Sequence, residues 1–180
     1  MELKHMRRVV TGHNTAGKSV VVFDGPPSQR ERNDSGIAQI WATDFSPVDN
    51  QIAGDPALRP VKLATPPGGS LFWLCKIAPM SAAASSADAE RNAKKALERF
   101  GAGDAIGASS SRPDMHATKT LDYAVVLSGE VTLILDHGEV TLKPFDTVVQ
   151  RGTNHTWENR GTEPALVTFV LLDAKPIPDA

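Results

Sequence analysis

The sequence contains a single cysteine, Cys75, among its 180 residues. An intramolecular disulfide and a zinc site made of several thiolates are therefore both excluded. A reducing compartment is the simplest explanation, and we expect a cytoplasmic protein. A chain of this length can bury a core of its own, so neither a disulfide nor a structural metal is needed for folding.

The chain also lacks an excess of charge of either sign. Its 19 Lys and Arg residues are balanced by 21 Asp and Glu residues, and no basic run is longer than the pair Arg7-Arg8. Nucleic-acid binding requires a cluster of positive charge. The composition therefore argues against a nucleic-acid partner and favours a small-molecule ligand.

Long hydrophobic runs are absent as well. The longest apolar stretches, such as Ala165–Leu172, have the length of a strand. A membrane helix needs about 20 apolar residues, so we expect neither a membrane span nor a signal peptide. The opening MELKHM matches a vector-derived extension before Met6, and the predicted fold leaves out residues 1–5.

What is present is a dense pattern of short strands. Residues 8–25 predict a hairpin that turns at Asn14–Gly17, with Gly17 in the left-handed position, and residues 38–44 and 71–79 predict two more strands. Six further strands are predicted near 115–127, 130–136, 139–142, 146–151, 155–159 and 165–172. Short strands separated by Gly-containing turns are typical of an antiparallel sandwich or barrel.

One helix is predicted at residues 86–100, with Ser86 as its N-cap and Gly101 at its end. Its narrow, Ala-rich apolar stripe places it on the surface. We expect one domain over residues 1–180. In it, residues 1–80 supply strands that complete the barrel, residues 81–114 form the helix and flexible loops, and residues 115–173 form the core of the barrel.

The stretch MHATKTLDYAVV places four polar side chains on one face of a strand. Because side chains alternate with a period of two, this face is shared by His116, Thr118, Thr120 and Asp122 and continues into Ala124 and Val126. An interior face that is polar at one end is costly unless its groups bind a ligand or one another. The alternation also turns Tyr123 outward, toward other outer side chains or a dimer contact.

The spacing of these residues resembles the first motif of the cupin superfamily, which is His-x-His, three residues, Glu, six residues, Gly. The corresponding residues here are His116, Thr118, Asp122 and Gly129. A second cupin motif ends in Gly, two residues, His, three residues, Asn, and is matched by Gly152, His155 and Asn159. The resemblance implies a mainly β fold, a cupin-type antiparallel jelly-roll barrel.

The resemblance also implies a site for one divalent metal ion, such as Fe, Mn, Zn or Ni. Because Thr118 replaces a ligand histidine and Asp122 replaces the glutamate, the implied ligands are His116, Asp122 and His155. Two further departures are Phe145 in place of a turn glycine and Gln150 near the position of a proline. Alternatively, the two histidines are core residues, hydrogen-bonded to neighbouring polar side chains in a barrel without metal.

Several other residues are candidates for the site. Thr118 and Thr120 are expected to orient a substrate or deliver a proton, and Trp157 and Asn159 are expected to contact the substrate. Trp157 shares the inward parity of His155 and suits either the core or a pocket wall. Lys76 is expected at the barrel rim and His137 at an exposed hairpin tip.

Three functions fit this pattern. The first is a metal-dependent lyase, such as a decarboxylase or another enzyme that cleaves C–C or C–O bonds in a small carboxylate or carbonyl compound. The second is an iron-dependent dioxygenase, and the third is a non-catalytic barrel that binds a small molecule. A homodimer is expected, because strand edges commonly pair and twofold symmetry is the most frequent arrangement.

Overall fold

The computed structural model describes residue 3 and residues 6–27, 36–52, 54–80, 112 and 114–176. These residues form ten strands and a short 3-10 helix, Pro56–Leu58. The strands are β1 Arg8–His13, β2 Ser19–Gly25, β3 Ile37–Thr43, β4 Ser70–Ile77, β5 Thr120–Ser128, β6 Val131–Leu135, β7 Glu139–Leu142, β8 Thr147–Arg151, β9 His155–Glu158 and β10 Ala165–Asp173. The helix predicted at residues 86–100 lies outside the described residues. No helix in the described ranges has the length and apolar character needed to cross a membrane.

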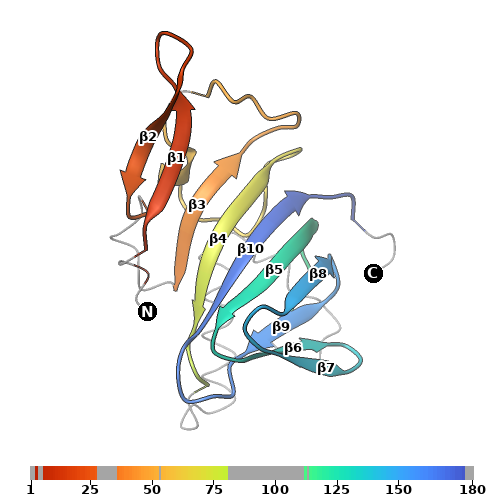
Figure 1. Cartoon of the computed structure of the whole chain (residues 1–180). Coiled ribbons are helices and arrows are strands. Elements are labelled where there is room, and N and C mark those ends of the chain that lie inside the picture. The colour runs from red at the N-terminus through yellow and green to blue at the C-terminus, as the bar shows by residue number, and fades with distance from the viewer. Residues whose placement is uncertain are drawn as a thin grey trace.

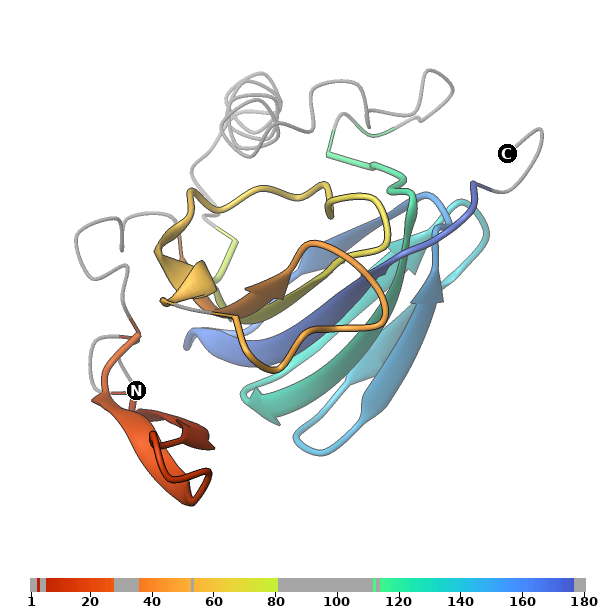
Figure 2. The same cartoon turned by 90° about the horizontal axis from the view of Figure 1, so that it is seen from above.

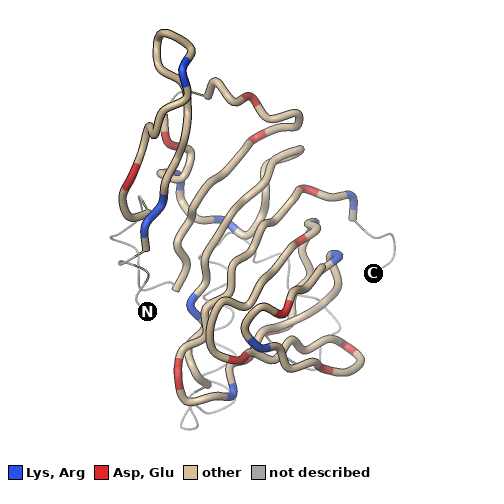
Figure 3. The backbone as a smooth tube through the Cα atoms, viewed as in Figure 1, with Lys and Arg blue, Asp and Glu red and all other residues tan. Residues whose placement is uncertain are grey.

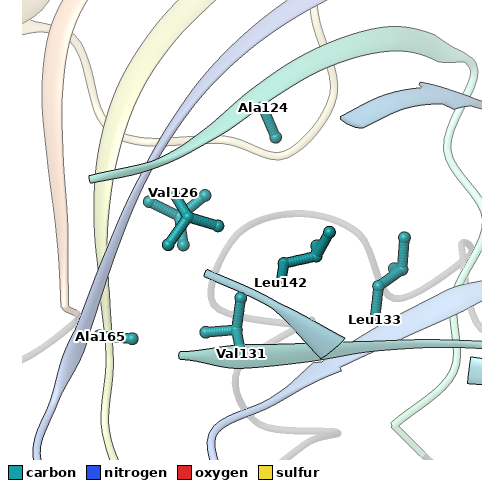
Figure 4. Close-up of a cluster of buried hydrophobic side chains, with 7 residues drawn as sticks. Ala124, Val126, Val131, Leu133, Leu142 and Ala165 are labelled. Atoms are coloured by element: carbon teal, nitrogen blue, oxygen red, sulfur yellow. The ribbon is translucent and has the colours of Figure 1, made fainter. Parts of the chain in front are cut away.

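Two antiparallel sheets enclose the main core (Figure 1). The larger sheet has the order β3-β4-β10-β5-β8 and the smaller one the order β7-β6-β9. Strands β5, β6, β7 and β10 contribute apolar side chains to one cluster between the sheets (Figure 4). Its fully buried members are Ala124, Val126, Val131, Leu133, Leu142, Ala165 and Val167. The mainly β, antiparallel jelly-roll prediction is therefore confirmed.

The strand predicted to begin at residue 115 begins only at Thr120. Just before it, His116 forms an isolated bridge with His155 of β9, which belongs to the smaller sheet. Strand β5 itself pairs with β8 and β10 of the larger sheet. The chain therefore passes from one sheet to the other between His116 and Thr120, and a single straight strand cannot do so.

The N-terminal hairpin turns as predicted, with Gly17 at φ 72°. It forms a two-stranded sheet of its own, however, and only β3 and β4 add to the larger sheet (Figure 2). Of the strands in residues 1–80, β3 and β4 therefore belong to the larger sheet, and β1 and β2 do not. Arg8 links the hairpin to the barrel through Asp55 and the Ile40 carbonyl, at 3.1 Å from the latter.

One turn residue, Phe145, and one core residue, Leu3, bear on expectations drawn from the sequence. Phe145 adopts φ 76° with an 83% exposed side chain, so it occupies the left-handed turn position in which glycine was expected. Leu3 is 5% exposed and packs in a cluster with Ala38, Leu74 and Leu166. Residues 1–5 were left out of the predicted fold, and Leu3 corrects that choice because its side chain belongs to the core.

Candidate active-site cavity

The inner face of β5 carries polar side chains at one end and apolar ones at the other. Thr120, Asp122, Ala124 and Val126 are all buried, whereas Tyr123 is 46% exposed on the outer face. The alternation predicted from the sequence is therefore confirmed along this strand. It brings a carboxylate into the interior of the barrel, beside the apolar core.

The two predicted histidines lie next to each other. The backbone of His116 donates to the carbonyl of His155 at 3.0 Å, and the backbone of His155 donates back at 2.9 Å. The centroids of the two imidazole rings are 4.6 Å apart. The bridge between the segment before β5 and β9 thus holds the two rings next to each other.

Each imidazole is oriented through its Nδ1 atom. His116 Nδ1 lies 3.2 Å from the Asp114 carbonyl oxygen, and His155 Nδ1 lies 2.8 Å from the Thr153 carbonyl oxygen. Since a carbonyl oxygen only accepts, both Nδ1 atoms carry hydrogen and both Nε2 atoms keep a lone pair. Metal-binding histidines are commonly held in this way by a partner on the second nitrogen.

Burial keeps both rings uncharged. It lowers the pKa of His155 to about 4, with a further contribution from the neighbouring His116. Burial also lowers the pKa of His116, although its hydrogen bond to the Asp114 backbone acts in the opposite direction. Neutral imidazoles are the form that binds a metal or accepts a hydrogen bond at neutral pH.

Asp122 carries an unsatisfied oxygen. The residue is 6% exposed, and its Oδ1 atom is buried without a hydrogen-bond partner among the described residues. Burial raises the pKa of Asp122 to about 6, although a hydrogen bond with Thr120 lowers it in part. A buried carboxylate with a free oxygen and a pKa near neutrality is suited to proton transfer.

These groups line a cavity of about 290 Å³. The polar and charged residues of this lining are His116, Thr118, Asp122, His155 and Lys76. The remaining lining is largely apolar and includes Trp157 and Phe169, whose rings meet edge to face at 5.4 Å. Its other members are Gly36, Ile37, Leu63, Trp73, Cys75, Ile77 and Leu171.

The two predicted catalytic threonines occupy different positions. Their hydroxyl oxygens are 2.7 Å apart, and only Thr118 lines the cavity. The backbone at Gly152 packs closely against the backbone at Thr118. A Cβ atom added at Gly152 would lie 2.9 Å from the Thr118 carbonyl oxygen. Thr120 therefore contacts the lining residues Thr118 and Asp122 without being part of the lining itself.

Asn159 does not line the cavity. Its side-chain amide donates to the carbonyls of Ile77 and Glu163 at 2.9 and 2.8 Å, and its carbonyl accepts from the Gly161 backbone. Asn159 is 1% exposed, and its side chain is hydrogen-bonded to the loop between β9 and β10. The hydrogen bonds of Asn159 thus hold this loop, whereas Trp157 lies at the cavity wall, one of the two positions expected for it.

The three predicted metal ligands are only partly assembled. Both histidines and Asp122 line the same cavity, yet within the described ranges no three His, Cys, Asp or Glu side chains lie close enough together to hold a metal ion. The donor types still fit a divalent ion, since two neutral imidazoles and a carboxylate are ligands that such ions use. Cys75 adds no thiolate, because burial raises its pKa to about 12.

A network of ion pairs and hydrogen bonds around Asp114, which the sequence analysis missed, holds the segment that carries His116. Arg112 pairs with Asp114 at 3.1 Å and with Glu158 of β9, and Thr156 donates to Asp114 at 3.0 Å. Although burial alone would raise the pKa of Asp114, the bonds from Arg112 and Thr156 lower it overall. Arg112 and Asp114 lie within residues 81–114, which were predicted to form a helix and flexible loops, so no local pattern marked them.

Comparison with known proteins identifies the family. The family model described as "Cupin domain" matches residues 102–171. "Phomopsin biosynthesis cluster protein C'" from Diaporthe leptostromiformis is 35% identical over 186 residues, which cover 98% of this chain and 82% of that protein. The chain belongs to the cupin family.

Other relatives of this cupin extend the comparison. "Cupin-domain-containing oxidoreductase virC" from Hypocrea virens is 31% identical over 186 residues, covering 97% of this chain and 79% of the relative. Among solved structures, a cupin 2 conserved barrel domain protein from Salinispora arenicola is 19% identical with a TM-score of 0.38. That alignment covers 65% of this chain and 72% of the other chain.

Proposed function

We propose that this cupin is a small-molecule enzyme of the lyase type, which eliminates or cleaves a group next to a carbonyl. The observation that carries the proposal is the unpartnered Oδ1 atom of Asp122 in the wall of a mostly apolar cavity. A carboxylate in this setting accepts a proton from carbon more readily than one that water solvates. Relatives named as biosynthesis cluster proteins and as oxidoreductases support an enzyme-like role.

In the proposed reaction, Asp122 removes a proton from the carbon next to the carbonyl. The electron pair left on that carbon forms a carbon–carbon double bond as a hydroxyl group on the next carbon departs. The departing hydroxide takes the proton that Asp122 has removed and leaves as water, so Asp122 returns to its starting form and the step needs neither an oxidant nor a reductant. Thr118, whose hydroxyl lies 2.7 Å from that of Thr120, would orient the departing oxygen.

His116 and His155 would supply two imidazole ligands to a divalent metal ion through their Nε2 atoms, while Asp122 would stay free to remove the proton. A metal ion bound there would act as a Lewis acid that polarises the carbonyl of the substrate. The chain's own contribution is to present two uncharged imidazoles in a fixed orientation, through Asp114 and Thr153. Metal content is measured directly by elemental analysis of protein purified without chelators.

A second candidate function is an oxidoreductase. It is favoured by the names of relatives, which include cupin-domain-containing oxidoreductases from Hypocrea virens and Neurospora crassa. Two imidazoles and a carboxylate are also ligands used by iron enzymes that activate oxygen. The two functions differ in the change of mass that they cause in a substrate.

The test is mass spectrometry on a panel of β-hydroxy and β-keto carbonyl compounds with apolar tails. Loss of water or carbon dioxide without oxygen consumption supports the lyase, whereas a gain of oxygen or a loss of hydrogen supports the oxidoreductase. His155→Ala should abolish turnover and bound metal, because it removes one of the two paired imidazoles. His137→Ala is the matched control, since His137 is exposed in the turn between β6 and β7. Full activity in His155→Ala would contradict both enzymatic proposals.

A further inference from the structure

Gln150 is a buried polar residue near the end of β8 that the proposed reaction does not use. It is 4% exposed, and in the register of β5 and β8 it lies opposite Asp122. Residues that lie opposite each other on paired strands share one face of a sheet, so Gln150 lies on the inner face that carries Asp122. A buried side-chain amide is costly unless it is hydrogen-bonded, so the partners of Gln150 show what it does there.

The side-chain amide of Gln150 is bonded to Thr153. Its Nε2 atom donates to the Thr153 carbonyl oxygen at 3.2 Å and also donates to the Thr153 hydroxyl. The Oδ1 atom of Asp122, by contrast, has no partner among the described residues. Gln150 therefore holds the turn between β8 and β9 rather than the carboxylate on the neighbouring strand.

The Thr153 carbonyl is also the group that orients His155. Its oxygen lies 2.8 Å from His155 Nδ1, so it accepts from His155 and from Gln150 at the same time. A carbonyl oxygen has two lone pairs and can accept both bonds. The bond from His155 keeps hydrogen on Nδ1 and leaves a lone pair on Nε2. Gln150 thus fixes the direction of the carbonyl on which this tautomer depends.

Two further contacts hold the same turn without reaching this carbonyl. Gly152 packs closely against the backbone of the segment before β5, and Asn154 donates to the Asp136 carboxylate at 2.8 Å. These contacts act at the two ends of the turn, and neither involves the oxygen that accepts from the imidazole. The bond from Gln150 acts on that oxygen directly.

We propose that Gln150 is a positioning residue, which keeps the Nε2 atom of His155 free of hydrogen by fixing the Thr153 carbonyl. The cupin motif has a proline near this position, and a proline side chain offers no donor, so this bond is not part of the motif. The proposal rests on the proposed function only for what Nε2 does, namely binding the metal ion. The tautomer itself is a property of the metal-free protein.

Nuclear magnetic resonance of the isotope-labelled, metal-free protein near neutral pH tests the tautomer directly. Long-range proton–nitrogen correlation distinguishes a ring nitrogen that carries hydrogen from one that keeps a lone pair. We expect the unaltered protein to carry hydrogen on Nδ1 of both His116 and His155. Gln150→Met preserves the length of the side chain and removes the donor. It should shift part of the His155 population to hydrogen on Nε2 and leave His116, which is oriented through Asp114, unchanged.

Gln39→Met is the matched control. Gln39 is 1% exposed, and its amide also donates to two backbone carbonyls, those of Ala57 and Arg59, at 3.4 and 3.3 Å. It does not line the cavity, so its loss should lower stability and leave both tautomers unchanged. A His155 tautomer that is unchanged in Gln150→Met, or that changes equally in Gln39→Met, would overturn the proposal.

Thr153→Val keeps the test open if Gln150→Met fails to fold. Thr153 is exposed, and this change removes only the hydroxyl that helps to hold the Gln150 amide. It should shift His155 in the same direction, to a smaller extent. In that case an unchanged His155 tautomer in Thr153→Val would overturn the proposal.

Titration with Zn²⁺ connects the tautomer to the proposed metal site. We expect Gln150→Met to bind Zn²⁺ about tenfold more weakly than the unaltered protein, because a ring nitrogen that carries hydrogen cannot bind a metal ion. Gln39→Met should bind as tightly as the unaltered protein. If the unaltered protein binds no Zn²⁺, the metal site of the proposed function is contradicted, and the tautomer measurement still decides the role of Gln150. The two failures are therefore distinguishable.

Discussion

The Asp122 carboxylate is buried on the inner face of β5, where an uncharged side chain of the same shape would be more stable. Burial raises its pKa from an ordinary 3.8 to about 6, so the folded protein binds a proton at Asp122 more tightly than the unfolded chain does. The ionised form therefore destabilises the fold. This cost is fully present above pH 6, declines between pH 6 and pH 4, and is absent at lower pH.

We therefore expect Asp122→Asn to raise the free energy of unfolding by about 1–3 kcal/mol above pH 6, while activity is lost. The gain should shrink as the pH falls and should vanish below about pH 4. Denaturant unfolding of chelator-treated protein across this pH range measures the effect. Asp49→Asn, which alters an exposed residue, is the control and should leave the free energy of unfolding unchanged. A gain in Asp122→Asn that is equal at all pH values would refute the explanation.

At the scale of elements, the segment before β5 is fastened to β9. Thr156 donates to the Asp114 carboxylate at 3.0 Å, and the Asp114 carbonyl accepts from His116 Nδ1 at 3.2 Å. The same carboxylate binds Arg112. One residue thus links an ion pair, a hydrogen bond from β9 and the orientation of an imidazole. Thr156 is therefore a positioning residue that acts on His116 through Asp114.

Thr156→Val removes this hydrogen bond and preserves the volume of the side chain. We expect a loss of about 1 kcal/mol in stability and a drop of about tenfold in metal affinity, because the orientation of His116 is loosened. Metal titration followed by unfolding measures both quantities. The matched control is Thr132→Val on the neighbouring strand β6, where the lost bond is to Thr141 at 3.4 Å. Equal losses of metal affinity in the two variants would show that Thr156 has only a structural role.

At the scale of the whole molecule, the described charged residues are scattered, whereas apolar side chains form a continuous row on the outer face of the larger sheet. Among the described residues, Lys and Arg are distributed over many parts of the chain, with acidic residues between them (Figure 3). The outer face of the larger sheet carries a cross-strand row of Phe72, Val170, Tyr123 and Val149 on β4, β10, β5 and β8. Val149 is 62% exposed and Tyr123 is 46% exposed. We propose that two copies pack through this row as a symmetric dimer.

The expected mass in solution is twice the 19.2 kDa of the chain, measured by sedimentation or light scattering. Val149→Asp should shift the protein toward the monomer by introducing a charge into the row. Val140→Asp places the same charge on β7, at an exposed position of the smaller sheet, and should leave the mass unchanged. A dimer that persists in Val149→Asp would remove this face from consideration.

Much of the fold could be predicted because it depends on local repeats. The period-two alternation correctly turned Asp122 inward and Tyr123 outward, and the spacing of glycines marked the turns. The hairpin was predicted correctly as a hairpin, but not as a separate sheet, because its sequence does not specify which neighbour its edges pair with.

The sequence by itself determined the family, the strand pattern and the set of polar side chains that face the interior. Only the tertiary structure decided that His116 and His155 form a bridged pair, that Asp122 keeps an unpartnered oxygen, and that Asn159 belongs to a loop. The physical reason is that alternation along one strand is a local property of the backbone. Contacts such as those of Asp114 with Thr156, or of Asn159 with Ile77, join residues far apart in sequence and exist only once the sheets have packed.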